Sequence, residues 1–514
     1  MKRSTGILDG IRILDLSRML SGPYATMMLA DHGAEVIKIE EKNGDSSRRS
    51  GPFRKDDKNQ EWAGYFVSLN RQKKSICLDL KNEIDKEFFK NLVKNVDILL
   101  ENFRPGVMQR LGLSFYELKK LNPQLVYGSI TGFGLKEFGE SPYSNWPSYD
   151  VVAQAMGGLI SLTGFDEKNV VKVGPGVADI FSGALMSFGL LAALTKAKKT
   201  GVGQLVEVSM YDAIVSMCER AIYQFDLTNN IPKPDGNGHP LLAPFGIYKA
   251  LDGFIAIGIV EDTYWHILKK IISDKNLLND KKYGTISLRA KNRHSLNESL
   301  NKWTITYKKS DLIKMLGGKI PFGPVNNAYE IFNDVHTQKR ETVVEIDHFQ
   351  PGKKPWRVAA NPVKFLGYKF KLARPPMLGE HNSYYFSKQK EHNEDITIQS
   401  KIYSSGSCSC FINFVGVSEQ KYLIACNSFK WLEGKSFYLI CLIDSFQKDL
   451  LDTLIDKEIK FVFVEKNNSE RIKHLSTSPN SIDKNIGESD TFIGAHVKIQ
   501  EFEKELMLSA KIKI

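Results

Sequence analysis

Arg12-Ile13-Leu14-Asp15-Leu16 and Glu35-Val36-Ile37-Lys38-Ile39-Glu40 are two short apolar segments that decide the fold class. Their β-branched content predicts a strand at each position. Between them, Ser21-Gly22-Pro23 opens a helix that we expect over Tyr24–His32. A strand, a helix and a second strand in this order form a parallel pair joined by a right-handed crossover. The segment therefore predicts an α/β fold built on a parallel sheet.

The same alternation continues outward along the chain. Further strands are expected over Ser75–Leu80, Val96–Leu100 and Leu125–Ile130, with a helix over Ile84–Lys94. Residues 180–225 look helical except for a strand at 205–208. We interpret residues 1–225 as the first part of a Rossmann-like large domain, in which ligands bind beyond the carboxyl ends of the strands.

The composition changes three times after this domain. Residues 226–330 are expected to form a smaller α+β domain that contains the strand Gly253–Gly258, and residues 331–385 a return segment to the large domain. Residues 386–514 are an extra C-terminal extension, α/β or β-rich, whose role the sequence does not predict. Its apolar runs are Ser404–Ala425, Phe437–Leu442 and Ile459–Val464.

Length and charge limit the possible functions. A chain of 514 residues suggests two or three domains. The formal net charge is +11, and residues 401–514 hold equal numbers of basic and acidic residues, so the excess lies in the first 400. This favours a small polyanion such as a nucleotide with several phosphates, or a nucleic acid. A general bias toward lysine explains the charge nearly as well, and no block of like charge resembles a nucleic-acid arm.

No targeting or membrane segment is predicted. The N-terminus runs into a strand pattern and has no apolar signal core. The longest uncharged helical stretch, Ile180–Thr195, is short for a membrane span and is expected to be a buried helix. The six cysteines, including the Cys408 and Cys410 pair, suggest neither a disulfide framework nor a metal site. We therefore expect a cytoplasmic protein without metal, membrane or nucleic-acid partner.

The stretch Gly174-Pro175-Gly176-Val177-Ala178-Asp179-Ile180-Phe181-Ser182-Gly183 places a carboxylate after a tight turn, in the first turn of a long helix. The spacing superficially resembles a dinucleotide-binding turn, but Asp179 stands where a third glycine or alanine is needed and would repel a pyrophosphate. Two roles remain from the residues alone. Asp179 either complements the helix dipole, worth about 0.3–1 kcal/mol, or attacks an activated acyl group; on the residues alone, the first is favoured.

Motifs along residues 6–385 carry a resemblance to a known family. They are Gly10–Arg18 with Ser21–Tyr24, Gly33–Glu40, Glu101–Gly106, Ser148–Ala155, Thr200–Gln204, Ile320–Val325 and Leu378–His381. In order and spacing they resemble the class III coenzyme A (CoA) transferases, the family of formyl-CoA transferase and carnitine CoA-transferase. The resemblance implies a large α/β domain, a smaller domain and an interlocked homodimer.

The resemblance also implies a mechanism. Asp179 would be the nucleophile that takes the acyl group from an acyl-CoA, forming first an anhydride and then an aspartyl-CoA thioester, before CoA passes to a free carboxylic acid. Coenzyme A would be a substrate, and no cofactor is expected. Gly236-Asn237-Gly238 stands where the family has a glycine-rich active-site loop, or is a plain turn between domains.

A set of CoA-binding residues follows by resemblance. The residues implied are Leu20, Ser21, Leu78, Asp79, Leu80, Lys81, Asn102, Phe103, Arg104, Arg110, Trp146, Pro147, Ser148 and Tyr149. Leu20 and Ser21 are expected near the pantetheine arm. Residues 78–81, residues 102–104 and Arg110 are expected near the adenosine phosphates, and residues 146–149 on the path to Asp179. One position near the adenine, often arginine in the family, is Glu41 here.

Two other functions remain as alternatives. The α-methylacyl-CoA racemases resemble this chain but have a histidine where it has Tyr149, and a tyrosine with a pKa near 10 is a poor base for proton transfer. CoA transfer is therefore favoured. A non-catalytic acyl-CoA-binding subunit is the second alternative. His239 and His381 are interpreted as structural, and neither the acyl donor nor the acceptor acid is predicted.

Overall fold

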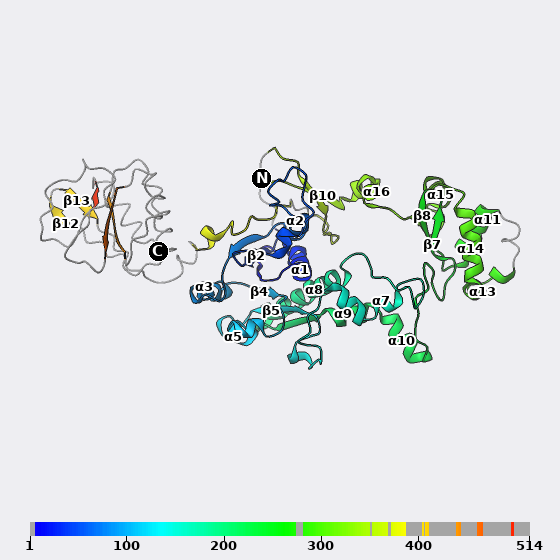
Figure 1. Cartoon of the computed structure of the whole chain (residues 1–514), viewed down its shortest axis with the longest axis horizontal. Coiled ribbons are helices and arrows are strands. Elements are labelled where there is room, and N and C mark those ends of the chain that lie inside the picture. Colours follow the sequence, from blue (N-terminus) through cyan, green and yellow to red (C-terminus); the bar gives the residue numbers. More distant parts are fainter. Residues whose placement is uncertain are drawn as a thin grey trace. The chain divides into compact units, whose positions relative to one another are not determined.

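The computed structural model describes residues 6–273, 281–349, 352–368 and 372–386, and five strands beyond them. Figure 1 gives the course of the chain and the labels of its elements. The chain divides into two compact units, Met1–Gly379 and Glu380–Ile514, which are taken in turn below.

A six-stranded sheet organises the first unit. Its strands are β1 (Arg12–Asp15), β2 (Glu35–Glu40), β3 (Lys74–Cys77), β4 (Ile98–Glu101), β5 (Val126–Thr131) and β6 (Leu205–Ser209). The spatial order is β3-β2-β1-β4-β5-β6, and every neighbouring pair is parallel. This is the order of a doubly wound nucleotide-binding sheet, whose order reverses between β1 and β4. The α/β fold class predicted from the sequence is confirmed.

Helices connect these strands. They are α1 (Ser21–Ala30), α2 (Gly64–Asn70), α3 (Glu83–Val93), α4 (Val107–Arg110), α5 (Phe115–Leu121), α6 (Asp150–Met156), α7 (Leu159–Leu162), α8 (Val177–Thr200), α9 (Met210–Met217) and α10 (Glu219–Thr228), with 3₁₀ turns η1 (Ser46–Arg49) and η2 (Lys136–Phe138). Local chemistry explains their beginnings: Asn82 caps α3, and Ser114 and Glu117 form a reciprocal capping box on α5. Helix α1 begins at Ser21 and not at the predicted Tyr24, because a proline is tolerated in a first helical turn.

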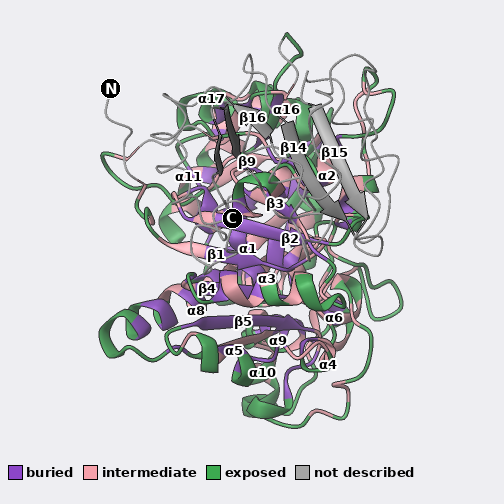
Figure 2. Cartoon of the chain, turned by 90° about the vertical axis from the view of Figure 1, so that its left-hand side faces the viewer, coloured by how far each residue is buried: buried purple, intermediate pink, exposed green. Residues whose placement is uncertain are grey.

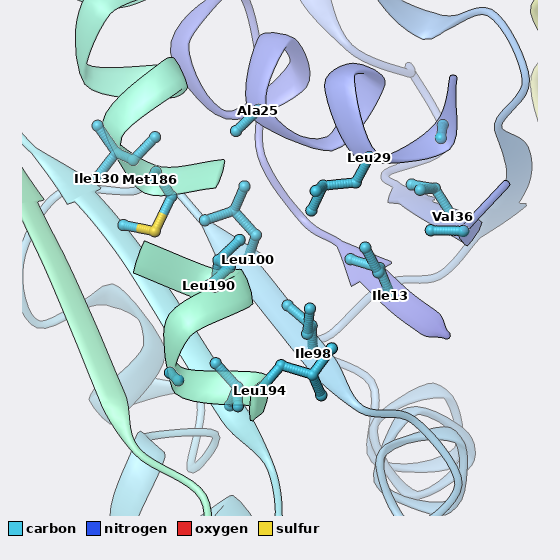
Figure 3. Packing of buried hydrophobic residues seen from close by; sticks show 14 of the residues in the cluster. Ile13, Ala25, Leu29, Val36, Ile98, Leu100, Ile130, Met186, Leu190 and Leu194 are labelled. Atoms are coloured by element: carbon cyan, nitrogen blue, oxygen red, sulfur yellow. The ribbon is translucent and has the colours of Figure 1, made fainter. Parts of the chain in front are cut away.

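The core of this domain lies between the sheet and the helices α1 and α8. Figure 3 shows Met186, Leu190 and Leu194 of α8 close to Ile98 and Leu100 of β4, and all five are buried. Strand β5 is buried along its whole length (Figure 2). By length and composition α8 could cross a membrane, but core helices of soluble proteins can be equally long and apolar. Here α8 packs on α1, β5 and β6.

A smaller α+β domain follows. Strands β7 (Phe245–Ala250), β8 (Gly253–Gly258) and β9 (Phe322–Pro324) form an antiparallel sheet. Its helices are α11 (Asp262–Ile272), η3 (Lys281–Tyr283), α13 (Ile286–Lys291), α14 (Arg293–Thr304) and α15 (Lys309–Leu316). Trp265 and Tyr248 are buried in its core. The predicted strand Gly253–Gly258 is β8 itself.

The next segment is more structured than the sequence suggested. It contains α16 (Ala328–Asn333), α17 (Val335–Arg340) and a hairpin of β10 (Val343–Ile346) and β11 (Trp356–Ala359). Asn327 and Asp334 cap the two helices. The hairpin packs through Ile346, Trp356 and Val358 against Trp62 of the large domain.

The second unit is described through its strands. β12 (Tyr403–Ser405), β13 (Ser407–Cys410) and β16 (Ala495–Val497) form one sheet, and β14 (Tyr438–Ile443) pairs in parallel with β15 (Lys460–Glu465). Strands β12 to β15 fall at the predicted runs beginning at Ser404, Phe437 and Ile459, although residues 411–425 of the first run lie outside the described residues, and β16 was not predicted.

Candidate active site

Asp179 lies in the first turn of α8, as the sequence predicted. Gly176 precedes the helix, and a Cβ atom there would come within 2.8 Å of Leu20 Cδ2. A side chain at position 176 would require the Leu20 side chain to shift, so the turn before α8 lies against the loop that joins β1 to α1. The nucleophile candidate and the predicted pantetheine-binding residue Leu20 are therefore neighbours.

A second carboxylate, Asp150, supports the turn that carries Asp179. Asp150 begins α6 and accepts a hydrogen bond from the backbone N–H of Ala178 at 2.8 Å. Gln154 Nε2 donates to the other Asp150 oxygen at 2.7 Å, while Gln154 Oε1 accepts from the N–H of Val173 at 3.1 Å. The segment 173–178 is thus held at both ends by one turn of α6.

Burial and the neighbouring charge of Asp150 raise the pKa of Asp179 to about 6, although a hydrogen bond from Ser21 acts in the opposite direction. Like charges close together disfavour the ionised form, and so does a low-dielectric surrounding. Asp179 is therefore a more basic carboxylate than an exposed aspartate, yet it is ionised at neutral pH. Asp150 was missed by the sequence analysis, although it lies next to the selected Tyr149.

The loop that joins β1 to α1 is fixed by Asn102. The Asn102 side chain accepts from the N–H of Arg18 at 2.8 Å and donates to the carbonyl of Arg18 at 2.8 Å. It also donates to Ser21 Oγ at 3.1 Å. Within this loop Met19 adopts a left-handed backbone conformation, with φ of 63°. Asn102 and Ser21 therefore lie beside the nucleophile, and Asn102 orients the hydroxyl that reaches Asp179.

Paired charges lie beneath the same loop. Lys73 Nζ lies 2.9 Å from Asp15, and Lys38 Nζ lies 3.0 Å from Asp45 and donates to the carbonyl of Ser17 at 2.7 Å. Burial favours a higher pKa for Asp15, but Lys73, Lys38 and two hydroxyl donors lower the pKa to about 2. Burial lowers the pKa of Lys73 to about 8. These pairs hold the loop from below.

Tyr65 of α2 is a second residue that the sequence analysis did not select. Burial raises the pKa of its phenol to about 12, and the negative charges of Asp179, Asp45 and Asp150 contribute. The hydroxyl therefore stays protonated and can donate a hydrogen bond near the nucleophile. The sequence offered no signal for it, since Tyr65 precedes Phe66 in an ordinary apolar helix.

A pocket of about 640 Å³ opens at the carboxyl ends of β1 to β4, a size suited to a small ligand. Six of the predicted CoA-binding residues line it: Leu78, Asp79, Leu80, Lys81, Phe103 and Arg110. Arg18 and Lys42 also line it and were not selected. Arg18 pairs with Glu41 at 2.6 Å and lies 5.2 Å from the centre of the Phe103 ring. Arg18 thus supplies a cation beside Glu41, where the family often has arginine.

The other selected residues lie elsewhere. Arg104 is exposed and is not among the residues that line the pocket. Trp146 packs on Tyr143 with ring centres 4.8 Å apart, and the segment Trp146–Tyr149 leads into Asp150. His239 stacks on Phe245 at 5.1 Å. Gly236, of the proposed glycine loop, donates its N–H to the carbonyl of Gly164 at 2.9 Å, which ties that loop to the large domain.

These residues place the Asp179 carboxylate beside the Ser21 hydroxyl, and the pocket is lined by cationic side chains that include Arg18, Lys42 and Lys81. Among the residues that the structure describes, no group of three histidine, cysteine or acidic side chains could hold a metal ion. The chemistry that the arrangement supports is attack by a carboxylate on an activated acyl group.

Comparison with known proteins agrees with this geometry. Residues 8–382 match the model of CoA-transferase family III. The chain is 39% identical over 380 residues to a succinyl-CoA:mesaconate CoA-transferase of Haloarcula hispanica, covering 74% of this chain and 95% of that protein. It is 31% identical to the succinyl-CoA:glutarate CoA-transferase of Mus musculus, covering 75% of this chain and 87% of that protein.

A solved structure agrees as well. A CaiB/BaiF family protein from Brucella suis superposes with a TM-score of 0.67 at 32% identity, covering 75% of this chain and all of that protein. The resemblance inferred from the motifs is thereby confirmed. The chain belongs to CoA-transferase family III and is an enzyme of that class.

Proposed function

We propose that the protein moves CoA from an acyl-CoA to a free carboxylic acid through covalent intermediates on Asp179. The Asp179 carboxylate attacks the thioester carbonyl and a C–O bond forms. The C–S bond then breaks, so that the CoA thiolate leaves and a mixed anhydride of the acyl group with Asp179 remains. The thiolate then attacks the aspartyl carbonyl, and the donor acid leaves as a carboxylate. The enzyme now carries an aspartyl-CoA thioester.

The second half repeats these steps in reverse. The acceptor carboxylate attacks the aspartyl thioester and expels the thiolate, giving a new anhydride. The thiolate attacks the acceptor's acyl carbon, so that the new acyl-CoA leaves and Asp179 regains its carboxylate. No electrons or water are consumed, and the thioester bond energy is kept.

The observation that supports this proposal is the environment of Asp179. A carboxylate whose pKa is raised to about 6 is ionised at neutral pH but more nucleophilic than an ordinary aspartate. Ser21 and Tyr65 are the hydroxyls near it that can stabilise the oxyanion that develops on the carbonyl.

The substrates we propose are dicarboxylic. The named relatives use succinyl-CoA with mesaconate or with glutarate. We therefore propose succinyl-CoA as the donor and a short dicarboxylic acid as the acceptor, with no resident cofactor.

Trapping tests the mechanism directly. Enzyme mixed with succinyl-CoA and quenched should show, by mass spectrometry, a CoA adduct on the peptide that contains Asp179. Asp179→Asn should show none, and Asp166→Asn, an exposed aspartate at a loop of the same domain, should show the adduct unchanged. An adduct on any other residue, or full transfer by Asp179→Asn, would contradict the proposal.

We also propose that the protein works as a homodimer. Large apolar side chains are strongly exposed in the single chain: Tyr149 is 71%, Phe188 74% and Leu227 77% exposed. Exposed apolar groups of this kind mark surfaces that a partner covers. A light-scattering mass near 116 kDa, twice the 58.1 kDa of one chain, is the expected result; a mass near 58 kDa would contradict it.

A further inference from the structure

Glu41 places a negative charge in a pocket whose other exposed charges suit a polyanion. It follows directly after β2 and lines the pocket at the carboxyl ends of β1 to β4. Lys42, Lys81 and Arg110 line the same pocket, and all three are exposed. A fixed carboxylate repels the phosphate groups that these cations attract. Its presence at this position therefore requires a physical explanation.

The two other acidic residues of the pocket are held by groups of the protein. Glu40 is buried and accepts hydrogen bonds from Arg48 Nε at 2.8 Å and Arg48 Nη2 at 2.7 Å. Asp79 accepts from the backbone N–H of Lys81 at 3.0 Å, in the turn before α3. The side chain of Glu41 is 60% exposed, so burial does not hold it in place. Glu41 is thus the carboxylate that a ligand in the pocket can meet.

Arg18 is the ion-pair partner of Glu41. Arg18 Nη2 lies 2.6 Å from Glu41 Oε1, and the guanidinium carbon lies 5.2 Å from the centre of the Phe103 ring. The Arg18 side chain is 40% exposed. Ion pairs at this level of exposure contribute little free energy, because solvent screens them and two long side chains lose freedom. The pair can therefore open when a stronger acceptor reaches the guanidinium.

The backbone of Arg18 is fixed, although its side chain reaches into the pocket. The Asn102 side chain accepts from the N–H of Arg18 and donates to its carbonyl, both at 2.8 Å. The guanidinium can therefore turn from Glu41 to a ligand without moving the loop that carries Ser21. A phosphate is the stronger acceptor, since it offers more than one negative charge and two oxygens that match the guanidinium donors.

We propose that Arg18 exchanges Glu41 for a phosphate of CoA when the ligand binds. Glu41 holds the guanidinium in the free enzyme, and the phosphate takes its place in the complex. Glu41 thereby sets the affinity for CoA, because binding must break the ion pair and leaves a carboxylate near the phosphate. A lowered affinity helps the enzyme to release its acyl-CoA product in every cycle. The inference rests on the proposed use of CoA as substrate, but not on the covalent steps at Asp179.

Two variants of the full-length protein should change CoA binding in opposite directions. In calorimetric titrations with CoA, Arg18→Gln should weaken binding about 10- to 100-fold, because it removes a charged donor. Glu41→Gln should tighten binding by about two- to fivefold, because an exposed ion pair no longer has to open. Unchanged binding in Arg18→Gln would overturn the proposal. Weaker binding in Glu41→Gln would do so as well, since Glu41 would then accept a hydrogen bond from the ligand.

Arg12 and Glu35 provide a matched control. They form an ion pair at 2.9 Å between the same two strands, but at the first residue of each strand, the end opposite the pocket. Arg12→Gln and Glu35→Gln remove the same charges as the pocket variants and should bind CoA like the wild type. Changes as large as those of the pocket variants would overturn the proposal, because net charge alone would then explain them.

Dephospho-CoA, which lacks the 3′-phosphate but keeps the pyrophosphate, identifies the group that Arg18 binds. A loss in Arg18→Gln that is confined to CoA assigns the 3′-phosphate, and an equal loss with both ligands assigns the pyrophosphate; either result supports the exchange.

A double variant tests the exchange itself. Glu41→Gln should tighten CoA binding less in the Arg18→Gln background than in the wild type, because Glu41 acts through Arg18. Equal tightening in both backgrounds would overturn the exchange. If these binding changes are found but no adduct forms on Asp179, the covalent mechanism fails and the exchange stands.

Discussion

Two groups of charges near the β1–α1 loop, one buried and one half-buried, have neighbours of opposite kinds. Beneath the loop, Asp15 and Lys73, and likewise Asp45 and Lys38, are paired at about 3 Å. In the second group, Asp179 and Asp150 carry the same sign, and among the described residues no cation offsets the rise in the pKa of Asp179. The first arrangement fixes the backbone. The second raises the free energy of the ionised Asp179 carboxylate.

The pKa values of Asp15 and Asp179 show what the difference in neighbouring charge does. Burial acts in the same direction on Asp15 and Asp179, yet the pKa of Asp15 is about 2 and that of Asp179 about 6. The identity of the neighbouring charge decides the outcome, not the depth of burial. Substitutions in the two places should therefore separate stability from activity.

The largest effect should come from Asp179→Ala. We expect a loss of transfer activity of about a thousandfold or more, because the proposed covalent intermediate cannot form on alanine. The same variant should be as stable as wild type or slightly more stable, since an unfavourable buried charge is removed. Steady-state kinetics with thermal unfolding checks both. A large loss of stability would show that Asp179 has a structural role.

Lys73→Met should have the largest effect on stability. Removing one partner of a fully buried pair leaves Asp15 unpaired, and we expect the free energy of unfolding to fall by about 3–5 kcal/mol. The adjacent Lys74 is a matched control, because it is partly exposed and pairs with Glu35. Lys74→Met should cost less than about 1 kcal/mol. Urea unfolding of both variants gives the comparison, and equal effects would contradict it.

Asp150→Asn should move the pH profile. Transfer requires ionised Asp179, so kcat/KM should fall as the pH drops below about 6. Removing the negative charge of Asp150 lowers the pKa of Asp179, and the acidic limb should move down by about one pH unit. Asparagine keeps an oxygen for the Ala178 N–H. Asp212→Asn serves as a control. If the acidic limb of Asp150→Asn does not move, burial alone raises the pKa of Asp179.

Ser21→Ala should shift the same limb in the other direction and by less. The Ser21 hydrogen bond lowers the pKa of Asp179, so its loss should raise the limb by a few tenths of a pH unit, roughly. Ser187 lies on α8, the helix that carries Asp179, but its hydroxyl bonds the carbonyls of Ala25 and Gly183, so Ser187→Ala should leave the acidic limb in place.

Truncation should have the smallest effect. The family match ends at residue 382, and the second compact unit begins at Glu380. A chain that ends after Phe386 should keep kcat and KM within about twofold, because a compact unit with its own core can fold without its neighbour. Loss of activity on truncation would show that residues 387–514 contribute to catalysis.

Much of the fold could be predicted from the sequence, because short apolar strands and capped helices leave local patterns. The strands around Arg12, Glu35 and Val126 were found in this way, and so was Asp179 in its helix turn. The hairpin of β10 and β11 was not, and its position depends on packing against Trp62, which is distant in sequence.

The site was predicted only in part for a different reason. Asp150, Tyr65 and Arg18 act through residues distant in sequence, and nothing local distinguishes them from capping, core or surface residues. Asp150 matters because it reaches the N–H of Ala178 across 28 positions, and Tyr65 because charges from three segments surround it. Such effects arise from the tertiary fold.

Gly183 has a consequence for how the enzyme moves. A Cβ atom at this position would come within 2.5 Å of the carbonyl oxygen of Ser21, so α8 and the start of α1 touch through their backbones. The two helices cannot move relative to one another at this point without losing their backbone contact. The acylated aspartate and the hydroxyl beside it should therefore travel as one rigid body through the whole catalytic cycle. Any hinge that admits the pantetheine arm must then be sought in the loops around residues 164–173 and 235–240.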